Sequence, residues 1–270
     1  MLKYFITNKI FSSSLDKMVP GYFRKKFLKI PNICFVPTNF NKLPLNNHPI
    51  FSSITHHKNI ISIFNNTQKE VTFKSYDNLI NLLNKKYKHN EEFNFLDFGG
   101  DQIDQYLILK KNFPNINYFI TNQNEINNHF KEIKKTYNFK NLFILSNLDE
   151  LLINTYDFAN FGSVLQYIDG YDELLNKILT KVNGYVLITA VHLYQQGARA
   201  KHVVKQVNLL PNKLYLYFFD FIQFIKIFKD CNFNVVFSEK NKTMDINYKN
   251  FNIKEMSDLK YTDILFKKNY

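Results

Sequence analysis

A short apolar run that leads into an acid and two glycines constrains this chain more than any other feature. Residues 93–98 read Phe-Asn-Phe-Leu-Asp-Phe, and Gly99 and Gly100 follow directly. The run has the length and composition of a buried strand, and glycines let the backbone turn and approach a ligand closely. A strand that delivers an acid and a glycine turn to the edge of a parallel sheet is typical of sites for nucleotide-like cofactors.

From about residue 74 onward, short apolar runs alternate with segments of helical length. Strands are predicted over residues 93–98, 117–121, 142–145, 157–161, 184–189 and 234–238, and helices over residues 76–83, 103–111, 125–136, 148–152, 171–179 and 219–231. Strands separated by helices indicate β-α-β units, so we expect an α/β fold with a Rossmann-like, doubly wound and mainly parallel sheet. Residues 261–266 predict a last strand that is inserted antiparallel to the others.

The first 70 residues differ in character and predict an N-terminal helical or irregular extension, followed by a main domain over residues 71–270. Residues 1–30 form a basic amphipathic segment, which suits packing on its own domain or peripheral contact with an anionic membrane. Residues 31–50 carry four prolines and predict a loop or extended connector. The pair His56 and His57 follows in a region that we expect to be irregular.

The formal net charge of +12 raises the question of a polyanionic partner. The basic residues are spread along the chain, and Arg24 and Arg199 are the only arginines. This pattern is more typical of a solvated surface than of a nucleic-acid interface, so we do not expect nucleic acid as the partner.

The cysteines and the apolar runs favour a cytoplasmic protein. Cys34 and Cys231 are far apart and lack metal-ligand spacing, which is typical of inert thiols in a reducing compartment. No apolar run approaches the ~18 residues that a transmembrane helix needs, and Lys9 interrupts the N-terminus before a signal-peptide core forms. None of the seven histidines lies at metal-ligand spacing from cysteines or carboxylates, so no metal site is expected.

In an open doubly wound sheet, ligands bind beyond the carboxyl ends of the strands, where the first predicted strand places Asp97, Gly99 and Gly100. Asp101 and Asp104 come next and would repel a pyrophosphate. They tolerate a zwitterionic or cationic ligand such as S-adenosylmethionine. The alternative is that the two glycines form only a tight turn and that Asp101 caps the following helix.

Polar residues also follow the later predicted strands. Asn122 follows the second predicted strand, at a place where ribose-binding enzymes of this architecture usually carry an acid. After the third strand, Leu148 and Asp149 suit an adenine pocket, or else Asn147 is an ordinary N-cap with acids in the first helical turn. The fourth and fifth strand ends supply Ser163, Gln166, Tyr167 and His192.

Three stretches carry a resemblance to a known family. They are residues 95–100 with Tyr106 downstream, residues 162–168 with Tyr171 and Leu174-Leu175, and residues 203–207 leading to Phe219 and a helix over residues 221–228. Together, over roughly residues 70–240, they resemble class I S-adenosylmethionine-dependent methyltransferases. More narrowly, they are similar to a bacterial group of methyltransferases associated with cell-surface polysaccharide genes.

The resemblance implies S-adenosylmethionine as the cofactor and a small molecule or a glycan as the methyl acceptor. It implies cofactor contacts at Asp97, Gly99, Gly100, Asn122, Leu148, Asp149 and Ser163. It implies substrate contacts at Gln166 and, from a loop that covers the pocket, at Gln206. If the acceptor is a hydroxyl, Tyr167 or His192 would be the base.

The chain departs from the family pattern at three places. Ile103 stands where the pattern has a third glycine, Asn122 replaces the expected acid, and residues 189–192 lack the Arg-Thr-Pro often seen after the fifth strand. Loss of one charged ribose contact costs about 1.5–3 kcal/mol, which is roughly ten- to hundredfold in affinity. Two alternatives therefore stand beside an active methyltransferase: a catalytically degenerate binding or scaffold protein with this fold, and an RNA-directed enzyme or binder.

Overall fold

In the computed structural model of the protein, residues 35–44, 53–66, 77–195, 200–206, 214–241, 248 and 256–269 are described. The basic amphipathic segment over residues 1–30, with the membrane contact considered for it, lies outside the described residues, and so does Cys34. Within the described ranges, no helix combines the length and the apolar character needed to cross a membrane.

The strands form one sheet in which most neighbours are parallel. The described strands are β1 (Phe35–Pro37), β2 (Asn94–Phe98), β3 (Asn117–Thr121), β4 (Leu142–Ile144), β5 (Tyr156–Gly162), β6 (Val182–Gln195), β7 (Lys201–Gln206), β8 (Leu214–Asp220), β9 (Phe233–Lys240) and β10 (Ser257–Lys268). Strands β4, β3, β2, β5 and β6 lie side by side in this order and run parallel. Strand β10 lies antiparallel between β6 and β9. The predicted mainly parallel sheet with an antiparallel last strand is confirmed.

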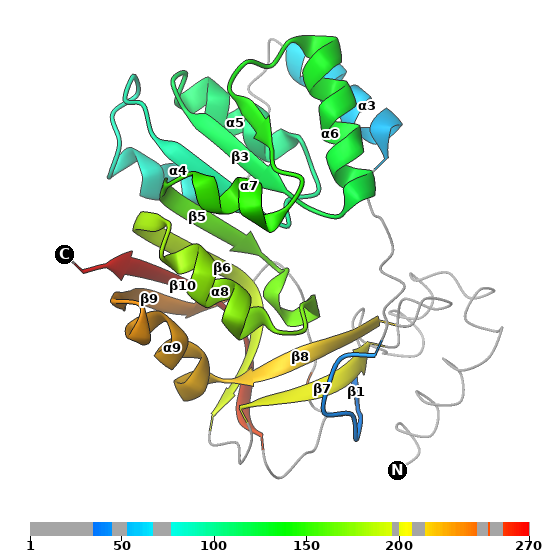
Figure 1. Ribbon diagram of the computed structural model, residues 1–270, viewed down its shortest axis with the longest axis vertical. Helices are drawn as coiled ribbons and strands as arrows, with labels where there is room; N and C mark the ends of the chain where they lie inside the picture. The colour runs from blue at the N-terminus through cyan, green and yellow to red at the C-terminus, as the bar shows by residue number, and fades with distance from the viewer. Residues whose placement is uncertain are drawn as a thin grey trace, which may run out of the picture.

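Helices cover both faces of this sheet (Figure 1). They are α3 (Ile54–Asn66), α4 (Asp77–Asn84), α5 (Asp104–Asn112), α6 (Asn124–Tyr137), α7 (Leu148–Ile153), α8 (Tyr171–Leu179) and α9 (Phe221–Asp230), with a short 3-10 helix, η3 (Leu165–Tyr167). Apolar residues of α3 to α6 form one buried cluster with the strands, and those of α7 to α9 form another. The sheet is therefore doubly wound, as the alternation of strands and helices predicted.

Alternation along the strands explains the two clusters. In β2, Phe95 belongs to the cluster under α3 to α6, whereas Leu96 belongs to the cluster under α7 to α9, and both side chains are fully buried. Phe95 stacks on Tyr118 and Phe158 from the two neighbouring strands, each with ring centroids 5.3 Å apart. Full burial of a side chain of this size contributes about 1.5–3 kcal/mol, so the central strands anchor the position of the turn that follows β2.

The region around His56 and His57 is helical, and the prediction that it is irregular was wrong. Helix α3 begins at Ile54, and the Ser53 hydroxyl accepts a hydrogen bond from the His56 backbone N–H at 3.2 Å. Ile61 is fully buried in the cluster that α5 and α6 share. The helix is stabilised chiefly by this tertiary packing, because its sequence lacks acids in the first turn and bases in the last.

Two further predictions fail on the strands beyond the main sheet. The helix predicted over residues 219–231 begins only at Phe221, because Phe219 and Asp220 end β8 and the Asp220 carboxylate caps α9 by accepting the Gln223 N–H at 3.0 Å. Gln206 lies in β7 rather than in a loop, with register partners on β1 and β8. Strands β1, β7 and β8 are called the strand extension below.

Strand β6 runs past the predicted end at residue 189 and joins the main sheet to the strand extension. It bends at Ala190, whose φ is +60°, and the Asp263 carboxylate accepts the Ala190 N–H at 2.7 Å. Before the bend β6 pairs with β5, and beyond it Leu193 and Tyr194 pair with β8. The bend therefore places the strand extension beyond the carboxyl edge of the parallel strands (Figure 1).

Candidate functional site

The order of the parallel strands reverses at β2, which lies between β3 and β5. From β2 the chain proceeds outward to β3 and β4, and it then returns to the other side to form β5 and β6. In open α/β sheets the crevice outside the carboxyl ends at such a switch point is where ligands bind. The turn after β2 is therefore the first candidate site.

Both glycines of this turn are required by close packing. Gly99 has a φ of +82°, and a Cβ at this position would lie 2.5 Å from Val164 Cγ2. A Cβ on Gly100 would overlap the Asp97 carboxylate. The Gly99 N–H donates to the carbonyl oxygen of Thr121 at 2.8 Å, which fixes the turn against the end of β3. The side chains of Val164 and Asp97 thus occupy the space beside the two glycines, and only glycine fits at either position of the turn.

Asp97 is a buried carboxyl held by its neighbours on both adjacent strands. It is only 3% exposed, Oδ2 accepts from the Tyr118 hydroxyl at 2.6 Å, and Oδ1 accepts from Asn160 Nδ2 at 3.0 Å. Burial raises the pKa of Asp97 to about 6, against the opposing effect of these two hydrogen bonds. The group is therefore a carboxylate at neutral pH that becomes protonated under mild acid.

Asn122 uses its side-chain amide on the glycine turn. Asn122 Nδ2 donates to the carbonyl oxygens of Gly99 at 3.0 Å and Gly100 at 2.7 Å, and Oδ1 accepts the Gln123 N–H at 2.7 Å. Asn127 in turn fixes the Asn122 backbone, since it accepts from the Asn122 N–H and donates to the Asn122 carbonyl, each at 2.9 Å. An aspartate at position 122 could not donate to the turn in this way.

Two more acids make the start of α5 electronegative. Asp101 and Asp104 both raise the pKa of Asp97, after burial, through their negative charges. Burial and the charge of Asp104 also raise the pKa of Asp101. Asp101 does not cap α5, because the N-cap residue is Ile103 and no side chain bonds there. Three neighbouring carboxyls favour a ligand with positive charge at this turn.

The end of β5 connects the glycine turn to the bend in β6. Ser163 follows β5 with a φ of +52°, next to the Val164 side chain that packs on Gly99. Gln166 is 1% exposed, and its Nε2 donates to Ser163 Oγ at 2.9 Å and to the Ala190 carbonyl at 3.1 Å. Gln166 Oε1 is buried and has no hydrogen-bond partner among the described residues. It is therefore an acceptor that a donor group of a ligand would satisfy.

His192 lies in a cluster of aromatic rings where the strand extension meets β6 and β10. Its ring stacks on Phe218 with centroids 4.6 Å apart, and edge contacts come from Phe35 at 4.9 Å. Its Nδ1 lies 2.7 Å from the Tyr248 hydroxyl. Burial lowers the pKa of His192 to about 3, so the imidazole is neutral at neutral pH. Tyr167 packs against the same cluster, and burial raises the pKa of its phenol.

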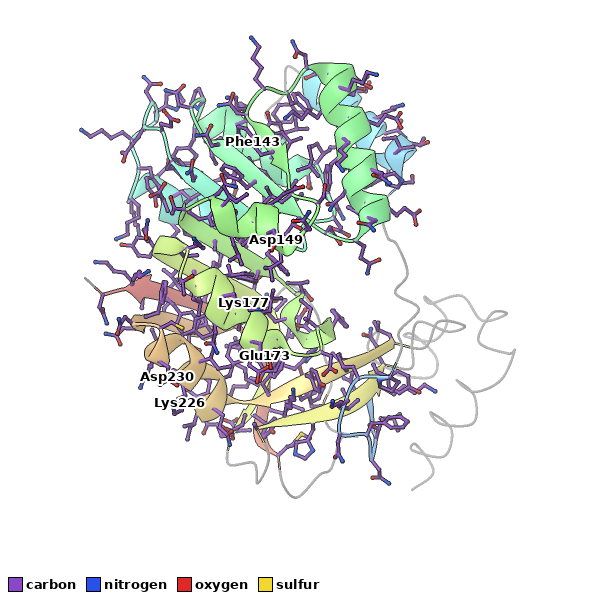
Figure 2. All side chains as sticks on the ribbon, viewed as in Figure 1. Phe143, Asp149, Glu173, Lys177, Lys226 and Asp230 are labelled. Atoms are coloured by element: carbon purple, nitrogen blue, oxygen red, sulfur yellow. The ribbon has the colours of Figure 1, made fainter. Side chains whose placement is uncertain are left out.

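The remaining predicted site residues are Leu148, Asp149 and Gln206. Asn147 is the N-cap of α7 and accepts the Glu150 N–H at 2.9 Å, which confirms the simpler interpretation of this strand end. Leu148 is half-buried, and Asp149 is exposed on the first turn of α7 (Figure 2). Gln206 is buried between β1 and β8. No hydrogen bond joins any of these three side chains to the glycine turn within the described residues.

Sequence reasoning missed the residues that hold the turn in place. Tyr118 and Asn160 bond Asp97, and Val164 packs on Gly99. The hydrogen bond between Ala190 and Asp263, which fixes the bend in β6, was missed as well. One signal was available: Asn160 is an amide within the apolar run of residues 158–161. A polar residue in a buried strand needs a partner, and here that partner is the acid at the next strand.

Two cavities lie elsewhere on the molecule. One of about 250 Å³ lies between β6, β9, β10 and α9, and one of about 500 Å³ lies between α7 and α8. Neither is lined by Asp97, Gly99 or Gly100. Among the described residues, no three histidine, cysteine or acidic side chains are grouped so that they could hold a metal ion.

Comparisons with known proteins show a similarity of fold only. No protein-family model matches the chain, and no curated protein matches it either. Among solved structures it is similar to a candidate sarcosine dimethylglycine methyltransferase from Galdieria sulphuraria, with 12% identity, a TM-score of 0.50, and coverage of 74% of this chain and 87% of that chain. It is also similar to the cyclase SpnF, with 10% identity, a TM-score of 0.50, and coverage of 75% and 84%.

The protein therefore has the class I methyltransferase fold. The two similar structures carry different activities in their names, a methyl transfer and a cyclisation. The fold alone does not fix the reaction, so the function has to be argued from the residues at the site.

Proposed function

We propose that this protein is an S-adenosylmethionine-dependent methyltransferase that acts on a small-molecule acceptor and holds the cofactor at the glycine turn. The observation that carries this proposal is the left-handed turn at Gly99, placed at the carboxyl end of the strand where the sheet order reverses. A glycine turn at a switch point is a common place for a nucleoside ligand in sheets of this kind. The electronegative surroundings of Asp97, Asp101 and Asp104 suit the sulfonium and ammonium groups of this cofactor better than a pyrophosphate.

The surroundings of the two candidate bases bear on the acceptor. Methyl transfer from a sulfonium is an in-line displacement that depends mainly on positioning, and a base is needed when the acceptor is a hydroxyl. The lowered pKa of His192 and the raised pKa of Tyr167 make both side chains weak proton acceptors at neutral pH. These pKa directions favour an acceptor that is nucleophilic without a base, such as a carboxylate or an amine that is unprotonated at neutral pH, over a glycan hydroxyl.

Calorimetry with S-adenosylmethionine tests the proposal through Asp97. The isosteric Asp97→Asn change removes the negative charge that the cofactor would meet, so we expect at least about tenfold weaker binding. Because burial raises the pKa of Asp97 to about 6, the wild-type affinity should also fall as the pH drops below 6, whereas the affinity of the variant should not.

Asp230→Asn is the matched control, because Asp230 is an exposed acid on α9 that pairs with Lys226 (Figure 2). It should leave the cofactor affinity unchanged. Absence of binding heat in the wild-type protein at millimolar S-adenosylmethionine and S-adenosylhomocysteine would refute the methyltransferase proposal.

One observation favours a second candidate, a binding or scaffold protein that keeps the fold without the chemistry. The side chain at the ribose position, Asn122, is committed to the carbonyls of Gly99 and Gly100. A protein that bound a nucleoside here would have to release these hydrogen bonds or bind the ribose through other groups. An Asn at this position is therefore as well suited to closing the turn as to holding a ligand.

The Asn122→Asp variant distinguishes the two candidates. A carboxylate loses both hydrogen bonds to the turn and repels the two carbonyl oxygens, so the free energy of unfolding should fall by about 1–3 kcal/mol. In a methyltransferase, the same carboxylate supplies a charged ribose contact, and S-adenosylmethionine affinity should rise about tenfold relative to Asn122→Ala. In a scaffold protein, neither variant should bind the cofactor in the same calorimetric titration.

A further inference from the structure

His57 is a buried titratable side chain that the proposed function does not use. It lies in the first turn of α3, the helix that packs against α5 and α6 (Figure 1). The residue is fully buried, and neither of its ring nitrogens has a hydrogen-bond partner among the described residues. A neutral imidazole carries one donor and one acceptor, so both polar atoms of the ring are left unsatisfied. A buried polar group in this state is rare in native structures and requires an explanation.

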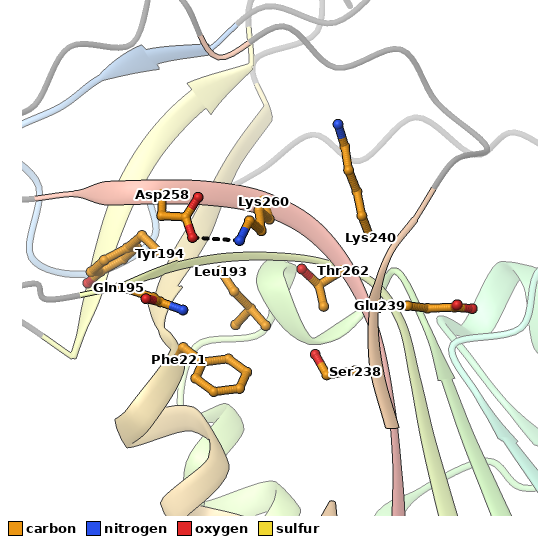
Figure 3. Close-up of a pocket in the computed structure, with 10 residues that line it drawn as sticks. All are labelled: Leu193, Tyr194, Gln195, Phe221, Ser238, Glu239, Lys240, Asp258, Lys260 and Thr262. Carbon is orange, nitrogen blue, oxygen red and sulfur yellow. Dashed lines mark hydrogen bonds and ion pairs between the residues drawn. The ribbon is translucent and has the colours of Figure 1, made fainter. Parts of the chain in front are cut away.

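The surroundings of His57 leave room for a proton but not for a larger ligand. Both ring nitrogens of His57, and Nδ1 of the neighbouring His129, are closed off from solvent. Neither of the two cavities described above is lined by His57, and the one in Figure 3 lies between β6, β9, β10 and α9. The described residues also hold no group of three side chains that could bind a metal ion. The chemical change open to this imidazole is therefore protonation.

The rings around His57 oppose a positive charge on its imidazole. From α6, the ring of His129 lies 6.2 Å away between centroids, and the ring of Phe130 packs edge to face on the imidazole with centroids 5.0 Å apart. From α3 itself, the ring of His56 also lies 6.2 Å away. Burial, and after it the positive charges of His129 and His56, lower the pKa of His57 to about 4.

The carboxylates of the elements that pack on α3 do not compensate a charge on His57. On α6, Glu132 pairs with Lys58 of α3 at 2.8 Å, and both side chains are exposed. At the start of α5, Asp101 and Asp104 lie beside the glycine turn. Within the described residues, none of these three acids is among the charges that shift the pKa of His57. A proton on the buried ring would therefore be uncompensated, which is strongly unfavourable.

We propose that the docking of α3 is controlled by pH: the helix packs on α5 and α6 while His57 is neutral and is released in mild acid. Protonation places a positive charge on a ring that faces two other histidines and an aromatic ring. Release of the helix brings the imidazole into water, where the charged form is favoured. The proton is thus the ligand that shifts α3 from the docked to the released state.

The released state exposes apolar surface beside the candidate site. Ile61 of α3 is fully buried in the same cluster as Ile103 and Tyr106, which lie just after the glycine turn. The first turn of α3 also lies close to this turn, because burial raises the pKa of Asp101 and the charge of His56 acts against that rise. Docking of α3 therefore covers the segment after the turn, whether or not the protein transfers a methyl group.

Hydrogen exchange of the full chain at pH 7 and pH 5 tests the proposal, with rates expressed as protection factors that correct for the intrinsic exchange rate. A pKa of 6.5 in the released helix and about 4 in the docked helix makes release roughly twentyfold more favourable at pH 5 than at pH 7. The protection factors of the α3 amides should fall by about this ratio. In His57→Phe and His57→Leu, which differ in shape but bind no proton at this position, they should stay nearly constant.

His192→Phe is the matched control, because it removes another buried histidine with a lowered pKa, in the aromatic cluster of β6 and the strand extension. The fall in α3 protection should persist in this variant. An NMR titration of the wild-type imidazole of His57 adds a measurement without a substitution, and its midpoint should lie well below 6.5.

Four results would overturn the proposal. The α3 amides keep their protection at pH 5 in the wild-type protein, or they lose it equally in both His57 variants. The loss disappears in His192→Phe, which would mean that global unfolding rather than release of α3 is observed. The imidazole of His57 titrates near 6.5, which would mean that water reaches the ring in the docked helix.

Discussion

Replacing Gly99 with alanine is expected to destabilise the protein strongly and to abolish cofactor binding at the turn after β2. Two costs combine at this position. A left-handed φ of +82° costs an alanine about 1–2 kcal/mol. The added Cβ would also lie 2.5 Å from Val164, and overpacking of this kind costs about 1–3 kcal/mol. Urea unfolding should therefore show a loss of about 2–5 kcal/mol with an unchanged m-value.

Gly170→Ala is the matched control for this prediction. Gly170 also has a left-handed φ, of +71°, but within the described part of the chain no atom beyond its own neighbours lies within 4 Å of an added Cβ. This variant should lose only the conformational part, about 1–2 kcal/mol, and should keep its affinity for S-adenosylmethionine. Equal losses of stability in the two variants would show that the contact with Val164 does not restrain the turn.

The parallel sheet and most of its helices could be predicted from the sequence because local pattern and global fold agree there. The strand over residues 117–121 and the helix over residues 171–179 occur within the predicted bounds. Helix α3 was missed because its sequence carries few helix-terminus signals, and its apolar residues are explained by packing on α5 and α6. The start of α9 was misplaced because the aromatic residues that end β8 are equally compatible with a helix.

The candidate site could be predicted only in part. The glycine turn and Asp97 are adjacent in the sequence, so their combination is visible there. The hydrogen-bond partners of Asp97 are not visible in the sequence. Asn160 lies 63 residues away, and its contact with Asp97 depends on the register between β2 and β5. The role of Asn122 also depends on geometry, since a one-residue shift of β3 would point its amide away from the glycine carbonyls.

His192 shows the same limit most clearly. The residue was predicted as a base from its place after a strand, and nothing nearby in the sequence indicates burial. Its surroundings come from Phe35, Phe218, Tyr248 and Tyr261, which belong to the strand extension, to β10 and to the segment before it. Only this long-range assembly determines that the imidazole is neutral, with a pKa lowered to about 3.

The change in the free energy of unfolding caused by His192→Phe is therefore expected to reverse its sign between neutral and acid pH. At neutral pH the variant loses the contact with the Tyr248 hydroxyl, and its free energy of unfolding should fall by about 1–3 kcal/mol. In the wild-type protein, burial holds the pKa of His192 at about 3 in the folded state against 6.5 when unfolded. The unfolded chain therefore binds the proton first, and stability is lost progressively as the pH falls from 6.5 toward 3. The loss at the acid end amounts to roughly 4–5 kcal/mol from this residue.

The phenylalanine variant has no proton to bind at this position, so its stability should fall less steeply. Unfolding curves measured between neutral and acid pH should cross, with the wild-type protein more stable at neutral pH and the variant more stable under acid. Burial also lowers the pKa of His57, to about 4. Its contribution to the pH dependence of stability is the same in both proteins and therefore cancels in the comparison. His89→Phe, at an exposed histidine, should run parallel to the wild-type curve. If the stabilities of His192→Phe and the wild-type protein change with pH in parallel, the ring reaches water in the folded state. His192 would then again be a candidate base.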